Sequence, residues 1–286
     1  MGSWSQRVER VRDHVRTHLA DELSVAVLAG VAHASPFHFG RRFRAHTGET
    51  PIQFVRRARL ERALVLMRTT DHALADVAAE VGLAPASNFS RVFKQTYGIA
   101  PSAWDGVTRL TPGLPGFDDA LAAFRDQAPS FHARLVDHPA ERLAAVSVAT
   151  PFMDDGLLAA GLATLRGWCA RHQVPAEPIV GMSWDNPDAT PIEQVRFELG
   201  VPVPRHLVVD GGLVVRQLPA RRAVAVRVQG SKAFIALAWE YLYDSWLPRS
   251  SSEPLDVPAM KRFRRAPDHD GWASFDLDCE LALSAQ

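Results

Sequence analysis

The stretch that decides the fold of this chain runs from residue 78 to residue 101 and reads AAEVGLAPASNFSRVFKQTYGIAP. Its first part is short and apolar and ends at Gly82. Its second part begins near Ala86, places Phe89 and Phe93 four residues apart, and ends at Gly98. Side chains four apart lie on one face of a helix, and glycine is the usual residue just after a helix. The stretch therefore predicts two short helices joined by a turn.

The same pattern occurs about fifty residues earlier, with Phe39 and Phe43 in the places of Phe89 and Phe93. An internal repeat indicates the unit of architecture, so the front of the chain is predicted to hold two helix-turn-helix motifs. A shift of 50 also aligns Val27 with Val77, Ala29 with Ala79, Val31 with Val81, Arg41 with Arg91, Gly48 with Gly98, Pro51 with Pro101 and Phe54 with Trp104.

Helical periodicity predicts seven helices and no strand in this front part. Ser24 and Ser35 are helix-start signals, and Pro51 begins a longer helix that is rich in arginine. We expect an all-α domain over residues 1–107. Its expected helices span residues 5–20, 24–32, 35–47, 51–69, 73–81, 86–97 and a short segment from Pro101.

The period of the sequence changes after a segment that is rich in Gly and Pro. Residues 108–130 are expected to form a linker with one or two helical turns near 118–125. Beyond it, runs rich in Val and Leu predict strands, and two helices are expected over residues 154–172 and 232–247. Residues 131–286 are thus predicted to form an α+β domain with an antiparallel sheet. Its expected strands span residues 132–137, 143–149, 195–203, 208–218, 223–228 and 275–283.

This second domain also repeats itself. Residues 139–148 are similar to residues 219–228, and residues 198–201 are similar to residues 280–283. We expect duplicated strand-helix-strand units, related by a pseudo-twofold axis, that pair into one antiparallel sheet. A cleft on that axis is the default place for a ligand.

The composition favours a folded, cytoplasmic protein with a polyanionic partner. The chain is 47% apolar with zero net charge, but residues 1–107 hold 14 Lys and Arg against 10 Asp and Glu. A basic domain suits double-stranded DNA. Cys169 and Cys279 form no metal-ligand spacing, and the sequence carries no pattern of a signal peptide or membrane span. No metal, cofactor or membrane partner is expected.

The second helix of each motif is the one expected to enter the major groove. Because its two phenylalanines face the interior, the opposite face is predicted to meet DNA. Arginine suits guanine, while serine and asparagine suit bases or phosphates. The candidate DNA-contacting residues are Phe37, His38, Gly40, Arg41 and Arg44 in the first motif and Ser87, Asn88, Ser90, Arg91 and Lys94 in the second.

Arg41 and Arg91 occupy the same place in both copies, which also fits arginines that tie helices together. Positions that differ between the copies, such as Phe37 and Ser87, are better candidates for reading different bases. The connecting helix over residues 51–69 has an expected length of ~28 Å, close to the ~34 Å between successive major-groove faces. Its arginines are expected at phosphates.

Residues 78–101 resemble the signature of the AraC/XylS regulators, and the resemblance covers residues 5–107. The stretch GMSWDNPDATPIEQVRFELGVPV, residues 181–203, resembles the GyrI-like effector-binding domain. The order of the two domains is similar to that of the Rob-type regulators. The resemblance implies a transcription regulator that contacts two adjacent major-groove segments and is modulated by a small cationic or lipophilic ligand. RNA polymerase is a further candidate partner.

In the family resembled, an acidic residue near the end of the last strand lies in the ligand pocket, and this position falls on Glu280. A carboxylate among aromatic rings favours cationic ligands. The alternatives are that the aromatic residues are ordinary core and that Glu198 pairs with an arginine such as Arg196. Residues 229–233 and the last few residues depart from the family pattern, which leaves the ligand class open. The candidate ligand-binding residues are Glu280, Glu198, Trp184, Trp239 and Tyr243.

Two other functions compete with this reading. The second domain could be a protein-interaction module without a small ligand. An enzyme, either a DNA-repair methyltransferase with a reactive cysteine or a GyrI-like hydrolase, is the rival from another class. A reactive thiol needs a neighbouring base. Cys169 has His172 three residues on, but it lies in a predicted amphipathic helix, so no catalytic residue is expected.

Overall fold

The computed structural model describes residues 4–106, 108–111, 117–126, 129–149, 154–186, 190, 195–255 and 257–284. The chain divides into two compact units after Thr111, with most of the described residues beyond that point in the second unit. Among the described residues, no helix is long and apolar enough to cross a membrane.

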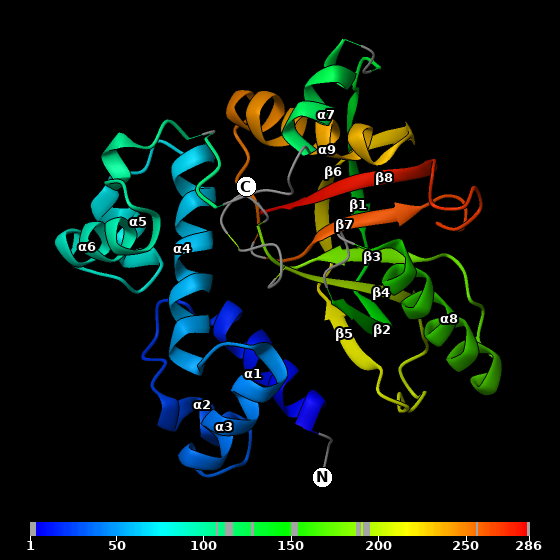
Figure 1. Cartoon of the computed structure of the whole chain (residues 1–286), viewed down its shortest axis with the longest axis horizontal. Coiled ribbons are helices and arrows are strands. Elements are labelled where there is room, and N and C mark those ends of the chain that lie inside the picture. Colours follow the sequence, from blue (N-terminus) through cyan, green and yellow to red (C-terminus); the bar gives the residue numbers. More distant parts are fainter. Residues whose placement is uncertain are drawn as a thin grey trace. The chain divides into compact units, whose positions relative to one another are not determined.

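The first unit is helical, as predicted (Figure 1). Ser24 accepts a hydrogen bond from the backbone N–H of Val27 at 3.3 Å, and Gly48 and Gly98 end two of the helices with φ of +80°. The last of the seven predicted helices is only a single 3-10 turn, Pro101–Ala103. The α-helices before it are α1 (Trp4–Thr17), α2 (Val25–Val31), α3 (Pro36–Thr47), α4 (Pro51–Thr69), α5 (Leu74–Glu80) and α6 (Ala86–Tyr97).

Helix α4 joins the two motifs and contributes to the cores of both. Thr50 and Gln53 form a reciprocal capping box at its start. Buried side chains within residues 54–58 belong to the core that contains Phe39 and Phe43. Buried side chains within residues 60–66 belong to the core that contains Phe89 and Phe93. One continuous helix therefore holds both motifs in a fixed register.

The offset of fifty residues applies from the second helix of each motif onward, but not to the first helix. α3 and α6 begin 50 residues apart, whereas α2 and α5 begin 49 apart. Buried Leu28 corresponds to buried Val77, while Val27, which a shift of 50 places on Val77, is 41% exposed. The predicted alignment of the first helices is therefore wrong by one residue. The additional residue lies in the second turn, where Ala84 and Pro85 precede α6.

The second unit contains one eight-stranded sheet in the order β1-β6-β8-β7-β3-β4-β2-β5 (Figure 1). All of its strand pairs are antiparallel, as predicted. The strands are β1 (Ala133–His138), β2 (Glu141–Ala149), β3 (Val180–Ser183), β4 (Arg196–Pro202), β5 (Val214–Leu218), β6 (Arg221–Gly230), β7 (Ala259–Phe263) and β8 (Phe275–Leu283).

Helices accompany the sheet at the expected places. α7 (Phe117–Arg125) precedes the first strand, α8 (Asp155–His172) packs on β2 and β4, and α9 (Lys232–Glu240) packs on β6 and β8. α9 continues directly into a π-helical stretch, Tyr241–Trp246, and then a 3-10 turn, Leu247–Arg249.

The sequence analysis missed two strands and overextended a third. β3 and β7, the central pair of the sheet, were not predicted. The strand expected over residues 208–218 is wrong in its first half, because Gly211 and Gly212 form a turn with φ of +64° and +87°. The strand begins only at Val214, and Val208 is 73% exposed.

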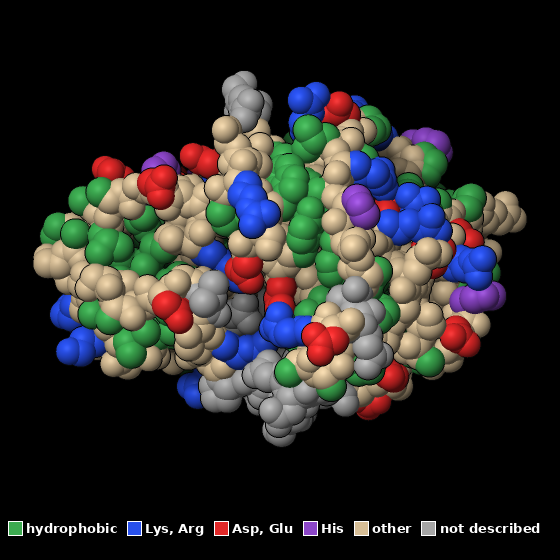
Figure 2. Space-filling model, turned by 90° about the horizontal axis from the view of Figure 1, so that it is seen from above, with side chains coloured by type: hydrophobic (Ala, Val, Ile, Leu, Met, Phe, Trp, Pro, Cys, Tyr) green, Lys and Arg blue, Asp and Glu red, His purple; other side chains and the backbone are tan. Residues whose placement is uncertain are grey.

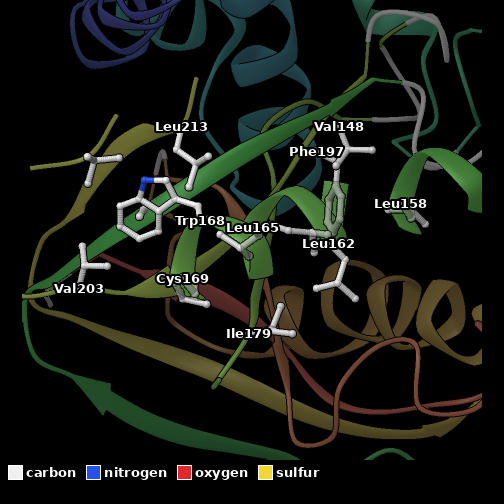
Figure 3. Packing of buried hydrophobic residues seen from close by; sticks show 14 residues of the cluster. Val148, Leu158, Leu162, Leu165, Trp168, Cys169, Ile179, Phe197, Val203 and Leu213 are labelled. Carbon is white, nitrogen blue, oxygen red and sulfur yellow. The ribbon is translucent and has the colours of Figure 1, made fainter. Parts of the chain in front are cut away.

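The strand register assigns each side chain to one of two faces, because directly paired residues of antiparallel strands point the same way. One row runs along Val226, Cys279, Lys261, Gly181, Leu199 and Val146. α9 covers the Cys279 end of this row and α8 covers the Leu199 end, so we call this side the helix face. Figure 3 shows the α8 cluster, with Trp168 beside Leu213 and Phe197 beside Val148 and Leu162.

The opposite side, which we call the polar face, carries a row along Ala225, Glu280, Met260, Met182, Glu198 and Ser147. Glu280 and Glu198 are 3% and 2% exposed, so this face is buried around them as well.

Candidate nucleic-acid interface and ligand site

Helix α3 presents its candidate residues on the side away from the core. Phe39 and Phe43 are fully buried, as predicted, while the candidate side chains are exposed or half-buried. Phe37 is the most exposed of them at 76%, and Arg41 lies over its ring with its guanidinium carbon 5.9 Å from the ring centre. His38 packs edge-on against Trp4 of α1 at 5.0 Å. A single exposed apolar side chain is common on protein surfaces, so the role of Phe37 in DNA contact stays a prediction.

Helix α6 presents a more polar surface. Phe89 and Phe93 are fully buried, and Arg91 is exposed. Arg91 donates to Asn88 Oδ1 at 2.8 Å and to Gln95 Oε1 at 3.2 Å, both within the same helix. Asn88 in turn donates to the backbone carbonyl of Leu83 at 3.1 Å. These contacts orient Arg91 outward and do not tie α6 to another helix.

Three arginines of α4, the helix whose arginines are predicted to contact phosphates, have partners within the first unit. Arg57 pairs with Glu49 and Glu61, each at 2.6 Å. Arg59 donates to the backbone carbonyls of Leu19 and Asp21, and Arg62 pairs with Glu80 at 2.9 Å. Arg59 and Arg62 thus connect α4 to other segments of the first unit, whereas Arg57 binds one residue of α4 itself and one in the turn before it. In contrast, Arg56 is exposed.

In the second unit, Glu198 forms a buried ion pair. It does not pair with Arg196, which instead binds Asp185 at 2.9 Å. Arg216 Nε donates to Glu198 Oε2 at 2.8 Å, and both side chains are at most 3% exposed. Trp184 belongs to the same group, because the guanidinium of Arg216 lies 4.6 Å from its ring centre. The carboxylate is thus already neutralised.

Glu280 is also paired. Arg262 Nε donates to Glu280 Oε2 at 2.7 Å, and Nε2 of His138 lies 3.0 Å from the same oxygen. Arg262 further binds Glu141, which also accepts from Arg221. Burial lowers the pKa of His138, against the raising effect of Glu280. Burial acts to raise the pKa of Glu141, but hydrogen bonds from Arg262 and Arg221 outweigh it, so that this pKa is lowered.

The structure does not bring the five predicted ligand residues together. Glu280, Glu198 and Trp184 group with the polar face, with Met260 and Met182 between the two carboxylates in one row. Trp239 and Tyr243 pack on the helix face with the α9 cluster, and their ring centres are 6.5 Å apart. As ligand contacts, all five remain predictions.

Two surface hollows occur beside the segment after β7, away from these five residues. One is lined by Glu177, Pro178, Ile179, Phe263, Arg264, Arg265 and Ala266. The other is lined by Gln229, Gly230, Arg265, Ala266, His269, Asp270, Ser274, Phe275 and Asp276. Arg227, on the strand that leads to the second hollow, pairs with Asp276 at 3.0 Å. Basic and acidic side chains also lie next to one another on the face of the molecule that Figure 2 shows.

Sequence reasoning missed Lys261, a buried amine in the centre of the helix face. Its Nζ donates to Ser183 Oγ at 2.7 Å and lies 4.9 Å from the ring centre of Phe197 and 5.7 Å from that of Trp239. Burial lowers its pKa to about 8. A sequence signal exists: the chain has 32 Lys and Arg residues, and Lys261 is one of only three lysines.

Both cysteines are buried. Burial raises the pKa of Cys169 and raises that of Cys279 to about 12. A reactive cysteine requires the opposite shift, towards the thiolate. Within the described residues, no cluster of three His, Cys, Asp or Glu side chains is arranged to hold a metal ion.

The chain matches two family models, the helix-turn-helix domain over residues 28–106 and the GyrI-like small molecule binding domain over residues 133–281. The second match covers more than half of the chain. The chain therefore belongs to the GyrI-like family, and it carries an AraC-type helix-turn-helix domain in front of that domain.

Individual relatives match one unit or the other. The MmsAB operon regulatory protein of Pseudomonas aeruginosa is 37% identical over 100 residues, which are 35% of this chain and 33% of the relative. A DNA gyrase inhibitor of Serratia proteamaculans is 27% identical over 149 residues, 51% of this chain and 93% of the relative. The chain spans about a third to a half of the length of the first curated relatives that it matches.

Solved structures divide in the same way. The DNA-binding domain of AdpA in complex with a target DNA is 27% identical, with 43% of this chain and 99% of that chain covered and a TM-score of 0.33. The C-terminal domain of EcmrR is 12% identical, with 55% and 100% covered and a TM-score of 0.44.

Proposed function

We propose that this protein is a transcription regulator that reads two neighbouring major-groove segments of double-stranded DNA through α3 and α6. The observation that carries the proposal is the matched geometry of the two helices. Each buries two phenylalanines four residues apart and exposes the opposite face, which bears arginine. Family membership supports it, since both units match models of DNA-binding and small-molecule-binding domains. We also propose that the protein acts in the cytoplasm and that it interacts with RNA polymerase.

The positions that differ between the two helices are proposed to read the sequence. Phe37, His38 and Gly40 of α3 correspond to Ser87, Asn88 and Ser90 of α6 through the offset of 50. All six of these residues are exposed or half-buried, whereas the phenylalanines that the two helices share are buried in the core. Shared residues build the platform, and different residues meet different bases.

An exchange experiment tests this assignment. The three α6 residues Ser87, Asn88 and Ser90 are replaced by Phe, His and Gly, and the preferred DNA is selected from a random pool for the wild type and the variant. We expect the preference to change in one half of the binding site only, because α3 is untouched. The matched control is Arg222→Ala in the sheet unit, whose side chain is exposed and pairs with Asp137. A footprint with a single protected major-groove segment contradicts the proposal.

The second unit is proposed to bind a small-molecule effector. We place this domain at residues 131–286 and the linker before it at residues 108–130.

The sheet of the second unit is proposed to be a duplication around a pseudo-twofold axis between β3 and β7. The strand order supports this: outward from that pair, β4, β2 and β5 follow on one side, and β8, β6 and β1 on the other. In chain order, β1, β2, α8, β3 and β4 are proposed to form one unit, and β5, β6, α9, β7 and β8 the other, so that each unit has two strands, a helix and two further strands. The first strand of each unit, β1 or β5, lies at the end of the sheet that the other unit occupies.

The rival functions are less well supported. A methyltransferase with a reactive cysteine conflicts with the raised pKa values of Cys169 and Cys279. A curated relative, AdaA of Bacillus subtilis, is described as a bifunctional transcriptional activator and DNA repair enzyme, and the match covers 37% of this chain. If the second unit is instead a protein-interaction module, a panel of small molecules leaves its thermal unfolding unchanged while DNA binding persists.

A further inference from the structure

Lys261 is a buried cation without a carboxylate partner. The structure describes three buried cationic side chains, Arg216, Arg221 and Lys261. Arg216 is paired with Glu198 and Arg221 with Glu141. The Lys261 ammonium donates to the Ser183 hydroxyl, and within the described part of the chain no Asp or Glu lies within ion-pair distance of it. A buried charge is ordinarily paired, because leaving water without a counter-ion is costly.

The surroundings of Lys261 are aromatic on two sides. Lys261 lies on the helix face, between Cys279 on β8 and Gly181 on β3. The ring of Phe197 lies over Gly181, since a Cβ atom added at that glycine is only 2.7 Å from the Phe197 ring. Trp239, on α9, provides the second ring and is half-buried. An ammonium, a hydroxyl and two ring faces thus converge at one point.

The choice of lysine fits a role other than pairing within the protein. Elsewhere in this unit the buried or half-buried ion pairs use arginine, as Glu198, Glu280 and Asp185 illustrate. Arginine forms forked pairs with carboxylates, whereas the lysine ammonium is a compact charge with three donors. Only one of those donors has a partner described above, and at neutral pH the amine still carries its proton, with a pKa of about 8.

We propose that Lys261 anchors the effector of the sheet unit and that this effector is an aromatic anion, such as an aromatic carboxylate. The inference rests on the proposed function and adds the charge of the ligand. The anionic oxygen accepts hydrogen bonds from the Lys261 ammonium and the Ser183 hydroxyl, while the body of the ligand lies against Phe197 and Trp239. The π-helical stretch begins two residues after Trp239, and such stretches are frequent at functional sites.

A cation fits this place poorly. It meets the like charge of Lys261, and the carboxylates that were expected to receive it, Glu280 and Glu198, lie on the polar face with arginine partners. The structure thus favours a negative ligand over the positive one that the sequence resemblance implied.

The test uses the full chain with ¹³C-labelled lysine, because three lysines give three side-chain signals. The probes are 1-naphthoate, the cation 1-naphthylmethylammonium and the neutral 1-naphthylmethanol. We expect naphthoate to shift the Lys261 signal while the signals of Lys94 and Lys232 stay in place. In calorimetric titrations, Lys261→Met should weaken naphthoate binding by about tenfold or more, the loss of one charge-assisted contact. Lys232→Met, at an exposed lysine of α9, is the matched control and should bind as the wild type does.

Thermal unfolding of the same variants separates a binding role from a structural one. If Lys261 serves the ligand, Lys261→Met removes an unpaired buried charge and raises the midpoint of unfolding while binding is lost. A lower midpoint together with unchanged naphthoate affinity overturns the inference, as does preference for the cationic probe or absence of naphthoate binding to the wild type. If the wild type does not bind DNA, the proposed function is contradicted, but the conclusion about Lys261 and naphthoate is unaffected.

Discussion

Arg216 and Lys261 are both buried in the sheet unit, yet they meet different surroundings. Arg216 is matched by the carboxylate of Glu198 and stacks near Trp184, whereas Lys261 has a hydroxyl and two rings. Neither arrangement could be deduced from the sequence. The partner of Glu198 was expected to be Arg196, two residues before it, but Arg216 on β5 reaches it across β2. Pairing across strands depends on sheet order, which local sequence does not encode.

Arg216→Met is predicted to destabilise the sheet unit strongly. It leaves the Glu198 carboxylate buried without its counter-ion, which typically costs about 3–5 kcal/mol. Urea unfolding followed by tryptophan fluorescence measures the loss. The double variant with Glu198→Leu removes both charges and should recover most of the stability. If the single and double variants are equally unstable, the pair contributes through packing and not through charge.

The contribution of Lys261 to stability is predicted to become more favourable as pH rises from about 8 to 10.5. Below pH 8 the amine is charged in both states, so folding carries the full cost of burying it. Between the folded pKa of about 8 and the ordinary value of 10.5, the unfolded chain binds a proton that the folded chain lacks. The facing thiol of Cys279 stays neutral there, because its pKa is raised to about 12.

The measurement for Lys261 is the free energy of unfolding of the wild type and of Lys261→Met across this range. A shift of this size corresponds to about 3 kcal/mol at 1.36 kcal/mol per pKa unit. The difference between the two proteins should shrink as pH rises. A difference that is constant from pH 7 to pH 10.5 contradicts the buried, titrating amine. Comparing the variants cancels the opposite contribution of the cysteines.

At the scale of elements, most of the helices followed from the sequence, and the central strands did not. Phe39 and Phe89 could be assigned to the core because the next phenylalanine follows four residues later and each helix ends at a glycine. β7 could not be found because Lys261 faces the apolar side, which inverts the expected alternation of the strand. β3 is short and has Gly181 in place of an apolar side chain. Such breaks in pattern are expected at functional sites.

Glycine substitutions in the first unit are predicted to have opposite signs. Gly48 and Gly98 have φ of +80°, and no atom lies near an added Cβ, so alanine is penalised there by backbone conformation alone, about 1 kcal/mol. Gly30 lies in α2 with equally open surroundings and ordinary φ, so alanine should stabilise by about 0.5–1 kcal/mol. Thermal unfolding of the three variants tests this. A stabilising effect at Gly48 or Gly98 contradicts the left-handed helix ends.

At the scale of the whole molecule, charge is divided between the units. Residues 1–107 have an excess of basic residues, and the rest of the chain has 18 Lys and Arg against 22 Asp and Glu. This division agrees with the proposal that the first unit binds DNA. The sequence also predicted two units with a helical front and an antiparallel sheet behind. The sequence could not predict which arginines of α4 are free to contact DNA. Arg57, Arg59 and Arg62 already have partners within the first unit.

Affinity of the full chain for its DNA site is predicted to fall steeply with salt. A protein that makes at least six phosphate contacts loses roughly 10³-fold in affinity between 50 and 200 mM salt. If Arg56 contacts a phosphate, Arg56→Ala should reduce the slope of log affinity against log salt by about one. Arg57→Ala should instead lower the stability of the first unit. Fluorescence anisotropy with labelled duplex gives the slopes, and a slope near zero for the wild type rules out phosphate-dominated binding.

The contribution of α4 to two cores has a consequence for how this protein can change over generations. An insertion of one residue within residues 51–69 turns everything after it by about 100° around the helix axis and moves it by ~1.5 Å. The exposed face of α6 then no longer points to the same side of the unit as that of α3, so the two helices could not enter neighbouring grooves as proposed. The turn before α6 is already one residue longer than the turn before α3, so an insertion there is expected to disturb the two cores less. We therefore expect related proteins to differ in the lengths of these turns while the length of α4 stays constant. The distance between the two halves of the DNA site would then be set by α4 alone.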